Sequence, residues 1–243
     1  MKGIILAGGT GSRLAPLTLV TNKHLLPVGR LPMILHAVAK LVSAGIDDIM
    51  VITGPEHMGA IVNLLGSGHD YDCNFTYRVQ SEAGGIAQAL GLCKNFVGLS
   101  DCCVILGDNI FEDDLKPLVW EFNAKREGDG TQYGAMVVLK SVEIEDAKRF
   151  GVAEIEADKI IGIQEKPAIP KSNKVVTGIY FYDFGVFNVI GQLKPSARNE
   201  LEITDVNNDY IKRHQMYFAE LSGRWTDAGT FSSLRYANEI MSK

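Results

Sequence analysis

A glycine-rich segment directly after the first apolar run, Leu6-Ala-Gly-Gly-Thr-Gly-Ser-Arg-Leu14, restricts this chain to few folds. The run before it is typical of a buried parallel strand, and in open α/β sheets ligands bind at the carboxyl ends of such strands. Gly8, Gly9 and Gly11 have no Cβ atom, so several peptide N–H groups can converge on an anion there. Arg13 adds a permanent cation at the rim. The segment therefore predicts a phosphate-binding loop in an α/β fold.

Two known phosphate-binding motifs do not match this loop. The dinucleotide-binding fingerprint needs a third glycine after Gly9-x-Gly11-x-x, but Leu14 stands there, and Pro16 follows too soon for an uninterrupted helix. A P-loop would end in Gly-Lys-Ser or Gly-Lys-Thr, which is absent. A plain glycine-rich turn with a surface arginine is the alternative that the loop alone leaves open.

The stretch after the loop, residues 16–27, is unsuited to a regular helix and contains Lys23. A single lysine is usually a solvated surface group. Lys23 precedes the apolar Leu25-Leu26-Pro27, so its stem can be anchored while its ammonium group reaches the loop. We therefore expect Lys23 to lie beside the glycine-rich loop.

Strands and helices alternate in the first half of the chain. Apolar runs predict parallel strands at residues 2–7, 49–53 and 102–106, and a helical stripe between Pro32 and Gly45 makes the first two a βαβ unit. After about residue 128, runs rich in β-branched and aromatic residues predict antiparallel or mixed strands. These strands are expected at residues 133–139, 152–155, 160–164 and 175–182. Further helices are expected at residues 56–65, 86–93, 115–125, 184–190, 205–213 and 231–241.

No repeat, linker or low-complexity tract divides the chain. We predict a single α/β domain, 1–243, built as a three-layer sandwich around a mostly parallel central mixed sheet. Its first part, about 1–128, and its smaller strand-rich part, about 129–243, are not expected to be independent. The length of 243 residues suits such a domain.

Charge and composition exclude several classes of function. The 29 acidic residues outnumber the 24 lysines and arginines, and this net charge of -5 argues against a nucleic-acid-binding surface. No stretch approaches the roughly 20 apolar residues of a membrane span, and the N-terminus lacks the pattern of a signal peptide. The four cysteines have no C-x-x-C spacing and are read as reduced thiols. We expect a cytoplasmic homo-oligomer that binds small molecules, and neither nucleic acid nor a membrane.

Two aspartates are candidates for a metal site. Asp108 follows the run 102–106 and a glycine, which places it at the carboxyl end of a strand. Asp227 lies more than a hundred residues later, between Trp225 and Gly229. Two carboxylates, completed by phosphate oxygens and waters, suit Mg²⁺ and not zinc. The alternative for each is a turn aspartate or a helix cap.

The motifs of this chain resemble, in order and over nearly its whole length, those of the sugar-1-phosphate nucleotidyltransferases. Besides the loop and Lys23-His-Leu-Leu-Pro27, the matching segments are Leu106-Gly-Asp-Asn-Ile-Phe111, Glu165-Lys-Pro167, Val176-Thr-Gly178, Glu200-Leu-Glu-Ile-Thr-Asp205 and Trp225-Thr-Asp-Ala-Gly-Thr230. The resemblance implies a Rossmann-like nucleotidyltransferase fold. It also implies transfer of a nucleotidyl group from dTTP to α-D-glucose 1-phosphate, giving dTDP-glucose and pyrophosphate by Mg²⁺-assisted in-line attack.

The resemblance assigns roles residue by residue, with nucleotide binding in the first part of the chain and sugar-phosphate binding in the second. Nucleotide binding is assigned to Leu6, Gly8, Gly9, Gly11, Arg13, Gln80, Gly85 and Asp108. Sugar-phosphate binding is assigned to Gly151, Glu165, Lys166, Val176, Tyr180 and Arg198. The resemblance further implies that Asp108 and Asp227 hold Mg²⁺ and that Arg13, Lys23 and Lys166 are the catalytic residues.

The chain departs from the family pattern at several positions. Phe150 replaces a frequent tyrosine, Ser81-Glu-Ala-Gly84 replaces a usual Pro-Ser-Pro-Asp stretch, and His24 stands where many members have glutamine. Longer members carry C-terminal helices that form a regulatory site. Because this sequence ends soon after Asp227, we expect no feedback control through such helices.

Two alternatives for the function remain open. The amide of Gln80 offers both a donor and an acceptor to a pyrimidine edge and does not separate thymine from uracil, so uridylyl or other nucleotidyl transfer is possible. A non-catalytic, nucleotide-sugar-binding regulatory subunit is the other. Such a module would be expected to have lost some of the charged residues of the site. These are all present: Arg13, Asp108, Lys166 and Asp227.

Overall fold

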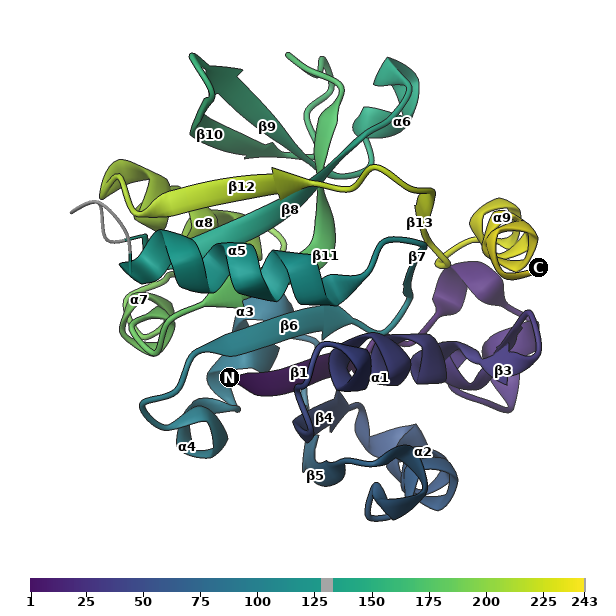
Figure 1. Cartoon of the computed structure of the whole chain (residues 1–243). Coiled ribbons are helices and arrows are strands. Elements are labelled where there is room, and N and C mark those ends of the chain that lie inside the picture. Colours follow the sequence, from purple (N-terminus) through teal and green to yellow (C-terminus); the bar gives the residue numbers. More distant parts are fainter. Residues whose placement is uncertain (128–132, 243) are drawn as a thin grey trace.

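A single mixed sheet passes through both halves of the chain in the computed structural model, which describes residues 1–127 and 133–242 (Figure 1). Its main path runs β10-β9-β11-β6-β1-β4-β5, and β8 and β12 are attached beside β11. The strands of the first half are β1 (Lys2–Ala7), β4 (Asp48–Thr53), β5 (Asn74–Val79) and β6 (Cys102–Leu106). Those of the second half are β8 (Ala135–Ser141), β9 (Gly151–Glu156), β10 (Lys159–Glu165), β11 (Lys174–Tyr182) and β12 (Met216–Glu220).

The two halves of the sheet differ in strand direction. In the first half β6, β1, β4 and β5 are all parallel. This was predicted for β1, β4 and β6 from their apolar runs, whereas β5 was not predicted. In the second half β11 pairs antiparallel with β8, β9 and β6, whereas β12 pairs parallel with β8. The pairing of Ile179 in β11 with Ile105 in β6 joins the halves directly. The boundary expected near residue 128 lies outside the described residues.

Helices cover both faces of the sheet. They are α1 (Met33–Ser43), α2 (Met58–Leu65), α3 (Ile86–Gly91), α4 (Lys94–Val97), α5 (Leu115–Glu127), α6 (Ile144–Ala147), α7 (Val186–Ile190), α8 (Ile203–Lys212) and α9 (Phe231–Met241). In Figure 1, α1 and α5 lie in front of the sheet and α3 and α8 behind it. The expected three-layer arrangement is therefore present.

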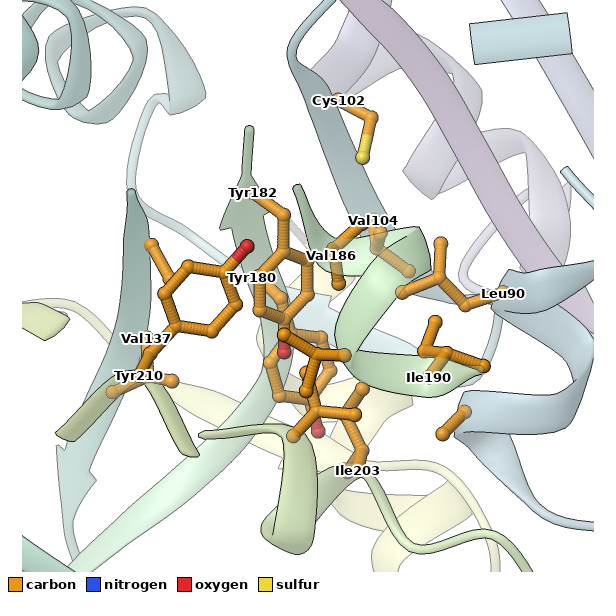
Figure 2. Packing of buried hydrophobic residues seen from close by; sticks show 14 of the residues in the cluster. Leu90, Cys102, Val104, Val137, Tyr180, Tyr182, Val186, Ile190, Ile203 and Tyr210 are labelled. Carbon is orange, nitrogen blue, oxygen red and sulfur yellow. The ribbon is translucent and has the colours of Figure 1, made fainter. Parts of the chain in front are cut away.

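Each face of the sheet has its own hydrophobic core. Successive residues of β1 alternate between the two: Ile4 and Leu6 pack into one core with α3, α7 and α8, and Ile5 and Ala7 into the other with α1, α2 and α5. Figure 2 shows the first core, where Tyr182 of β11 packs near the helices of that face. A strand buried on both faces has no polar alternation, which explains why the apolar runs marked these strands in the sequence.

Besides the two strands of a two-residue ladder, four strands were missed by the sequence prediction. Two are β5, an edge strand whose residues alternate between exposed and half-buried, and β12. The others, β7 (Asn109–Phe111) and β13 (Trp225–Asp227), have three residues each, too few for any period to be recognised. A further two-residue ladder joins β2 (Pro27–Val28) to β3 (Leu31–Pro32), directly before α1. Among the described residues, no helix combines the length and apolar character that crossing a bilayer requires.

Candidate active site

Two adjoining cavities open at the carboxyl ends of β1 and β6. The first, about 420 Å³, is lined by the glycine-rich loop and is called the loop cavity. The second, about 450 Å³, lies over β11 and the ends of β9 and β10 and is called the sheet cavity. Their common wall consists of Arg13, Ile86, Leu106, Asp108 and Glu200.

The predicted site residues divide between these cavities. The loop cavity is lined by Leu6, Gly8, Gly9, Arg13, Lys23, Gln80, Gly85 and Asp108. The sheet cavity is lined by Arg13, Asp108, Gly151, Glu165, Lys166, Val176, Tyr180, Arg198 and Asp227. Gly11 lines neither. Residues from opposite ends of the chain thus meet at one edge of the sheet.

Gly11 shapes the turn behind the loop. Its φ of 67° lies in the left-handed region, and a Cβ atom there would come within 2.9 Å of Thr18 Cγ2 and 3.0 Å of Lys23 Cβ. Short 3₁₀ turns at Ser12–Leu14, Leu17–Leu19 and Lys23–Leu25 follow. Residues 16–27 form no regular helix, as predicted, so the loop is not followed by a helix like that of a dinucleotide-binding loop.

The two aspartates are brought together by the backbone of β7 and β13. Asp227 pairs with Asn109 in the antiparallel ladder, and the amide of Ala228 donates to the carbonyl oxygen of Asp108 at 2.8 Å. A Cβ atom on Gly229 would lie 3.1 Å from Nη2 of Arg13 and 3.4 Å from Oδ2 of Asp227. The guanidinium of Arg13 therefore lies near the carboxylate of Asp227.

Asp108 is held in its ionised form. Nζ of Lys23 donates to its Oδ2 at 2.5 Å, and both side chains are largely enclosed. Burial by itself would raise the pKa of this carboxyl, but the charge and hydrogen bond of Lys23 outweigh burial and hold the pKa at about 2. Lys23 thus neutralises a carboxylate at the common wall, as well as reaching the loop as predicted.

Asp227 has the opposite electrostatic character. Burial and the nearby charge of Asp108 raise its pKa to about 6, although Arg149 and Arg13 act in the other direction. Two carboxylates that repel each other in a half-enclosed site favour the binding of a cation between them. Within residues 1–127 and 133–242 no group of three or more His, Cys, Asp or Glu could hold a metal. Two carboxylates fit a hard cation that takes its remaining ligands from phosphate and water.

Arg149, which the sequence analysis did not single out, lies against Asp227. It lines the sheet cavity, and its guanidinium carbon lies 5.2 Å from the centre of the Phe150 ring. A lone arginine before a strand has no signal in the sequence by which it could have been identified.

Asn109 was also missed as an individual residue, although it belongs to the segment that includes Asp108. Its buried Oδ1 accepts from Nε1 of Trp225 at 2.7 Å and from the amide of Gly178 at 2.9 Å, while its Nδ2 donates to Oδ1 of Asp108 at 3.2 Å. Asn109 therefore connects β7, β11 and β13 around the sheet cavity.

The far side of the sheet cavity carries alternating charges. Arg198 donates to Glu202 at 2.7 Å and to Glu165 at 3.4 Å, and the first of these bonds raises the pKa of Arg198. Glu165 also accepts from Oγ1 of Thr204 at 2.6 Å. Lys166 has a φ of 43°, a conformation that is uncommon for a residue with a side chain. This arrangement offers both cations and hydroxyl-binding carboxylates to a ligand.

Gln80 already bonds to the protein at the opposite end of the loop cavity. Its Nε2 donates to Oε1 of Gln88 at 2.6 Å and to the carbonyl of Gly85 at 3.2 Å. Its Oε1 faces Gly8, where a Cβ atom would come within 2.7 Å. The amide therefore has a defined orientation before any ligand binds.

The comparisons with known proteins point to one family. A family model described as nucleotidyl transferase matches residues 2–243. The chain is 41% identical over 241 residues to a glucose-1-phosphate thymidylyltransferase of Neisseria meningitidis, covering 98% of this chain and 81% of that protein. It is 42% identical over 240 residues to a glucose-1-phosphate thymidylyltransferase of Xanthomonas campestris, and the match covers 97% of this chain and 79% of that protein. A similar crystal structure comes from Bacillus anthracis and is provisionally described as a glucose-1-phosphate thymidylyltransferase in complex with a sucrose. Its sequence is 61% identical and its TM-score is 0.93, and the match covers 100% of this chain and 96% of that one.

Proposed function

Because this chain belongs to the nucleotidyl transferase family, we propose that it transfers the thymidylyl group of dTTP to α-D-glucose 1-phosphate. The products are dTDP-glucose and pyrophosphate. The relatives named for this activity match nearly the whole chain, and the substrates are carried over from those names.

One observation carries the proposal: Arg13 and Asp108 belong to the walls of both cavities. A nucleotide in the loop cavity and a sugar phosphate in the sheet cavity would bring their phosphates together at this wall. Two polyanions repel each other strongly, so a site that joins them needs positive charge at their meeting point. The side chains of Arg13, Lys23 and Arg149 lie around the two aspartates at this point.

The reaction needs no covalent intermediate with the protein. A phosphate oxygen of glucose 1-phosphate forms a bond to the α-phosphorus of dTTP, and the bond from that phosphorus to the leaving oxygen breaks, so that pyrophosphate leaves with the electron pair. We assign Arg13 and Lys23 to the triphosphate, and Lys166 and Arg198 to the incoming sugar phosphate. Holding the reactants in line and balancing their charge supplies the rate.

Asp108 and Asp227 are the residues that would hold a divalent cation, which we take to be Mg²⁺. Bound there, the ion would neutralise phosphate oxygens of both substrates. The remaining proposed residues act on the sugar. Glu165 accepts hydrogen bonds from sugar hydroxyls, and Gly151, Val176 and Tyr180 form the wall against which the ring packs.

A substrate panel tests the proposal. Five nucleoside triphosphates (dTTP, UTP, ATP, CTP and GTP) are each combined with the 1-phosphates of glucose, mannose and N-acetylglucosamine, and pyrophosphate release and nucleotide-sugar formation are measured together. The highest kcat/KM is expected for dTTP with glucose 1-phosphate. The Arg13→Ala protein, purified in parallel, controls for contaminating activity.

Each result of the panel has a distinct meaning. A higher kcat/KM for UTP would assign the enzyme to uridylyl transfer, and a preference for another sugar would reassign the acceptor. Absence of pyrophosphate release from every pair would leave a nucleotide-sugar-binding protein without catalytic activity.

A further inference from the structure

A third cavity, which we call the outer cavity, lies beyond Gln80 and next to the loop cavity, and the proposed function assigns nothing to it. Its volume is about 190 Å³, and it shares Gly8, Gly9, Thr10, Gln80 and Ala83 with the loop cavity. The rest of its lining consists of Asn22 and of the segments that follow β4 and β5, residues 54–57 and 81–82. A ligand in the loop cavity can therefore extend past Gln80 into this space.

The outer cavity differs from the loop cavity in charge. Its titratable side chains are Glu56, His57 and Glu82, and no lysine or arginine is among the described residues that line it. Both carboxylates are exposed to solvent. Arg13 and Lys23 line the loop cavity but not the outer cavity. A bound triphosphate therefore lies on the side of the two cations, and the base is the part of the nucleotide that reaches the outer cavity. This step rests on the proposed function.

The atoms of a pyrimidine ring have a fixed order, which determines which of them faces the outer cavity. The base is assigned to the amide of Gln80 and the backbone of Gly85, which together meet its O2–N3–O4 edge. With O4 at Gln80, the next ring atom beyond that side chain is C5. With O2 at Gln80, the next atom would be N1, and the pentose and phosphates would lie beside Glu56 and Glu82, away from Arg13. Only the first orientation agrees with the charges, and it directs C5 toward the outer cavity, which Gln80 lines and Gly85 does not.

Gly54 leaves the outer cavity open on the side of β4. Its φ of -71° is accessible to any residue. Among the described residues, a Cβ atom there would come within 4 Å of the carbonyl oxygen of Gly8 alone, at 3.4 Å. Neither the backbone nor a close neighbour therefore requires glycine at this position. A longer side chain at residue 54 would occupy the outer cavity, which the residue lines.

We propose that the outer cavity accepts a substituent on C5 of a pyrimidine base. The methyl group of thymine fills only a small part of this space, so larger groups fit as well. The two carboxylates favour an uncharged or cationic substituent over an anionic one. The specificity residues for substituted pyrimidine nucleotides are then Gly54, Glu56 and Glu82.

The first test compares 2′-deoxyuridine triphosphate (dUTP), which has no group on C5, with its 5-propynyl derivative, each with glucose 1-phosphate. The wild-type kcat/KM values should agree within about threefold, because the propynyl group enters space that already exists. Gly54→Leu should lower the ratio of the propynyl derivative to dUTP by about tenfold or more, because the site is then overfilled. Gly59→Leu makes the same change at an exposed glycine of α2 outside the cavity and should keep the wild-type ratio. An unchanged ratio in Gly54→Leu would overturn the inference.

The second test concerns the charge of the substituent. The 5-(3-aminoallyl) and 5-(2-carboxyvinyl) derivatives of dUTP carry opposite charges on groups of similar size. The wild type should prefer the cationic derivative by about two- to fivefold in kcat/KM, since exposed carboxylates interact weakly. Glu56→Gln combined with Glu82→Gln should bring the ratio close to one. Glu145→Gln combined with Glu156→Gln, at exposed positions outside the three cavities, changes the net charge equally and should keep the preference. An equal or higher kcat/KM of the wild type for the anionic derivative would refute the charge selection.

A labelling experiment on the wild-type protein does not depend on the folding of a variant. The probe, 5-azido-2′-deoxyuridine triphosphate, carries its photoreactive group on C5, and mass spectrometry locates the residues that it modifies. Labels are expected in residues 54–57 or 81–83, and excess dTTP should suppress them. Labels confined to other segments would place C5 outside the outer cavity. Failure of the wild type to use dTTP would remove the proposed function as well, whereas use of dTTP with rejection of the propynyl derivative would remove only the role of the outer cavity.

Discussion

Nη2 of Arg149 donates to both carboxylate oxygens of Asp227, at 3.1 Å to Oδ1 and 3.3 Å to Oδ2. Lys23 is paired with the other carboxylate of the site, Asp108, through a single bond to its Oδ2. Each aspartate proposed to hold a divalent cation is therefore paired with a cation of the protein. A metal ion that binds between these carboxylates has to compete with these side chains.

Arg149→Gln is expected to bind divalent metal more tightly at pH 8, where Asp227 is ionised. The gain should be about two- to fivefold, because the ion pair that must be displaced is partly exposed and weak. Mn²⁺ titration followed by electron paramagnetic resonance measures this directly. Lys148→Gln, which removes the neighbouring exposed cation, should leave the affinity unchanged. Weaker binding by Arg149→Gln would mean that this arginine supports the metal site.

Asp227 should make the metal-free protein less stable as the pH rises. Its pKa is raised from 3.8 to about 6, so between these values the folded protein binds this proton more tightly than the unfolded chain does. The stability that the group contributes is fully present below about pH 4 and is lost as the pH rises through about 6. Asp227→Asn stays neutral, so its melting temperature relative to wild type should increase from pH 5 to pH 7. A constant difference over this range would contradict the raised pKa.

Arg13→Ala should keep the fold and lose turnover. Arg13 is exposed apart from its place in the cavity wall, so its removal costs little packing. Loss of one charge donor from a preorganised site is expected to lower kcat by about 10²- to 10³-fold. Circular dichroism checks the fold, and Arg30→Ala, at an exposed arginine outside both cavities, is the control. Wild-type kinetics in Arg13→Ala would refute the assigned role.

Lys166→Gly should make the protein more stable and at the same time weaken its use of glucose 1-phosphate. The positive φ of Lys166 is unfavourable for a side-chain-bearing residue, and glycine relieves this at a gain of about 1 kcal/mol. The same change removes the proposed sugar-phosphate cation and should raise the KM for glucose 1-phosphate. Asp158→Gly relieves a φ of 59° in the exposed turn between β9 and β10 and should be stabilising without a change in KM. Urea unfolding and steady-state kinetics provide the two measurements.

Asn109→Ala should destabilise the protein and damage the site together. The substitution leaves the buried donors of Trp225 and Gly178 without their acceptor, at a cost of about 1 to 3 kcal/mol for each group. Urea denaturation should show a lower free energy of unfolding, and the indole fluorescence of Trp225 should change. A free energy within about 0.5 kcal/mol of wild type would show that these donors find other partners.

The elements that the sequence predicted best are two strands buried on both faces and one amphipathic helix. The bounds predicted for β1, β6 and α9 agree with the structure residue for residue, because an uninterrupted apolar run or a clear helical stripe has sharp ends. The edge strand β5 and the three-residue strands β7 and β13 lack such a signal. Yet β7 and β13 are the elements that bring Asp108 and Asp227 together.

The sequence by itself determined the alternating α/β order, the glycine-rich loop and the kinds of charged residue that the site contains, since these depend on local pattern and on residue type. Only the tertiary structure decided which charges are neighbours. The pairing of Arg149 with Asp227 and the position of Asn109 between Trp225 and Gly178 join residues far apart in the chain. The contrast between the pKa values of the two aspartates arises in the same way, from burial and from charges on other elements. Such effects act through space, so no local sequence pattern carries them.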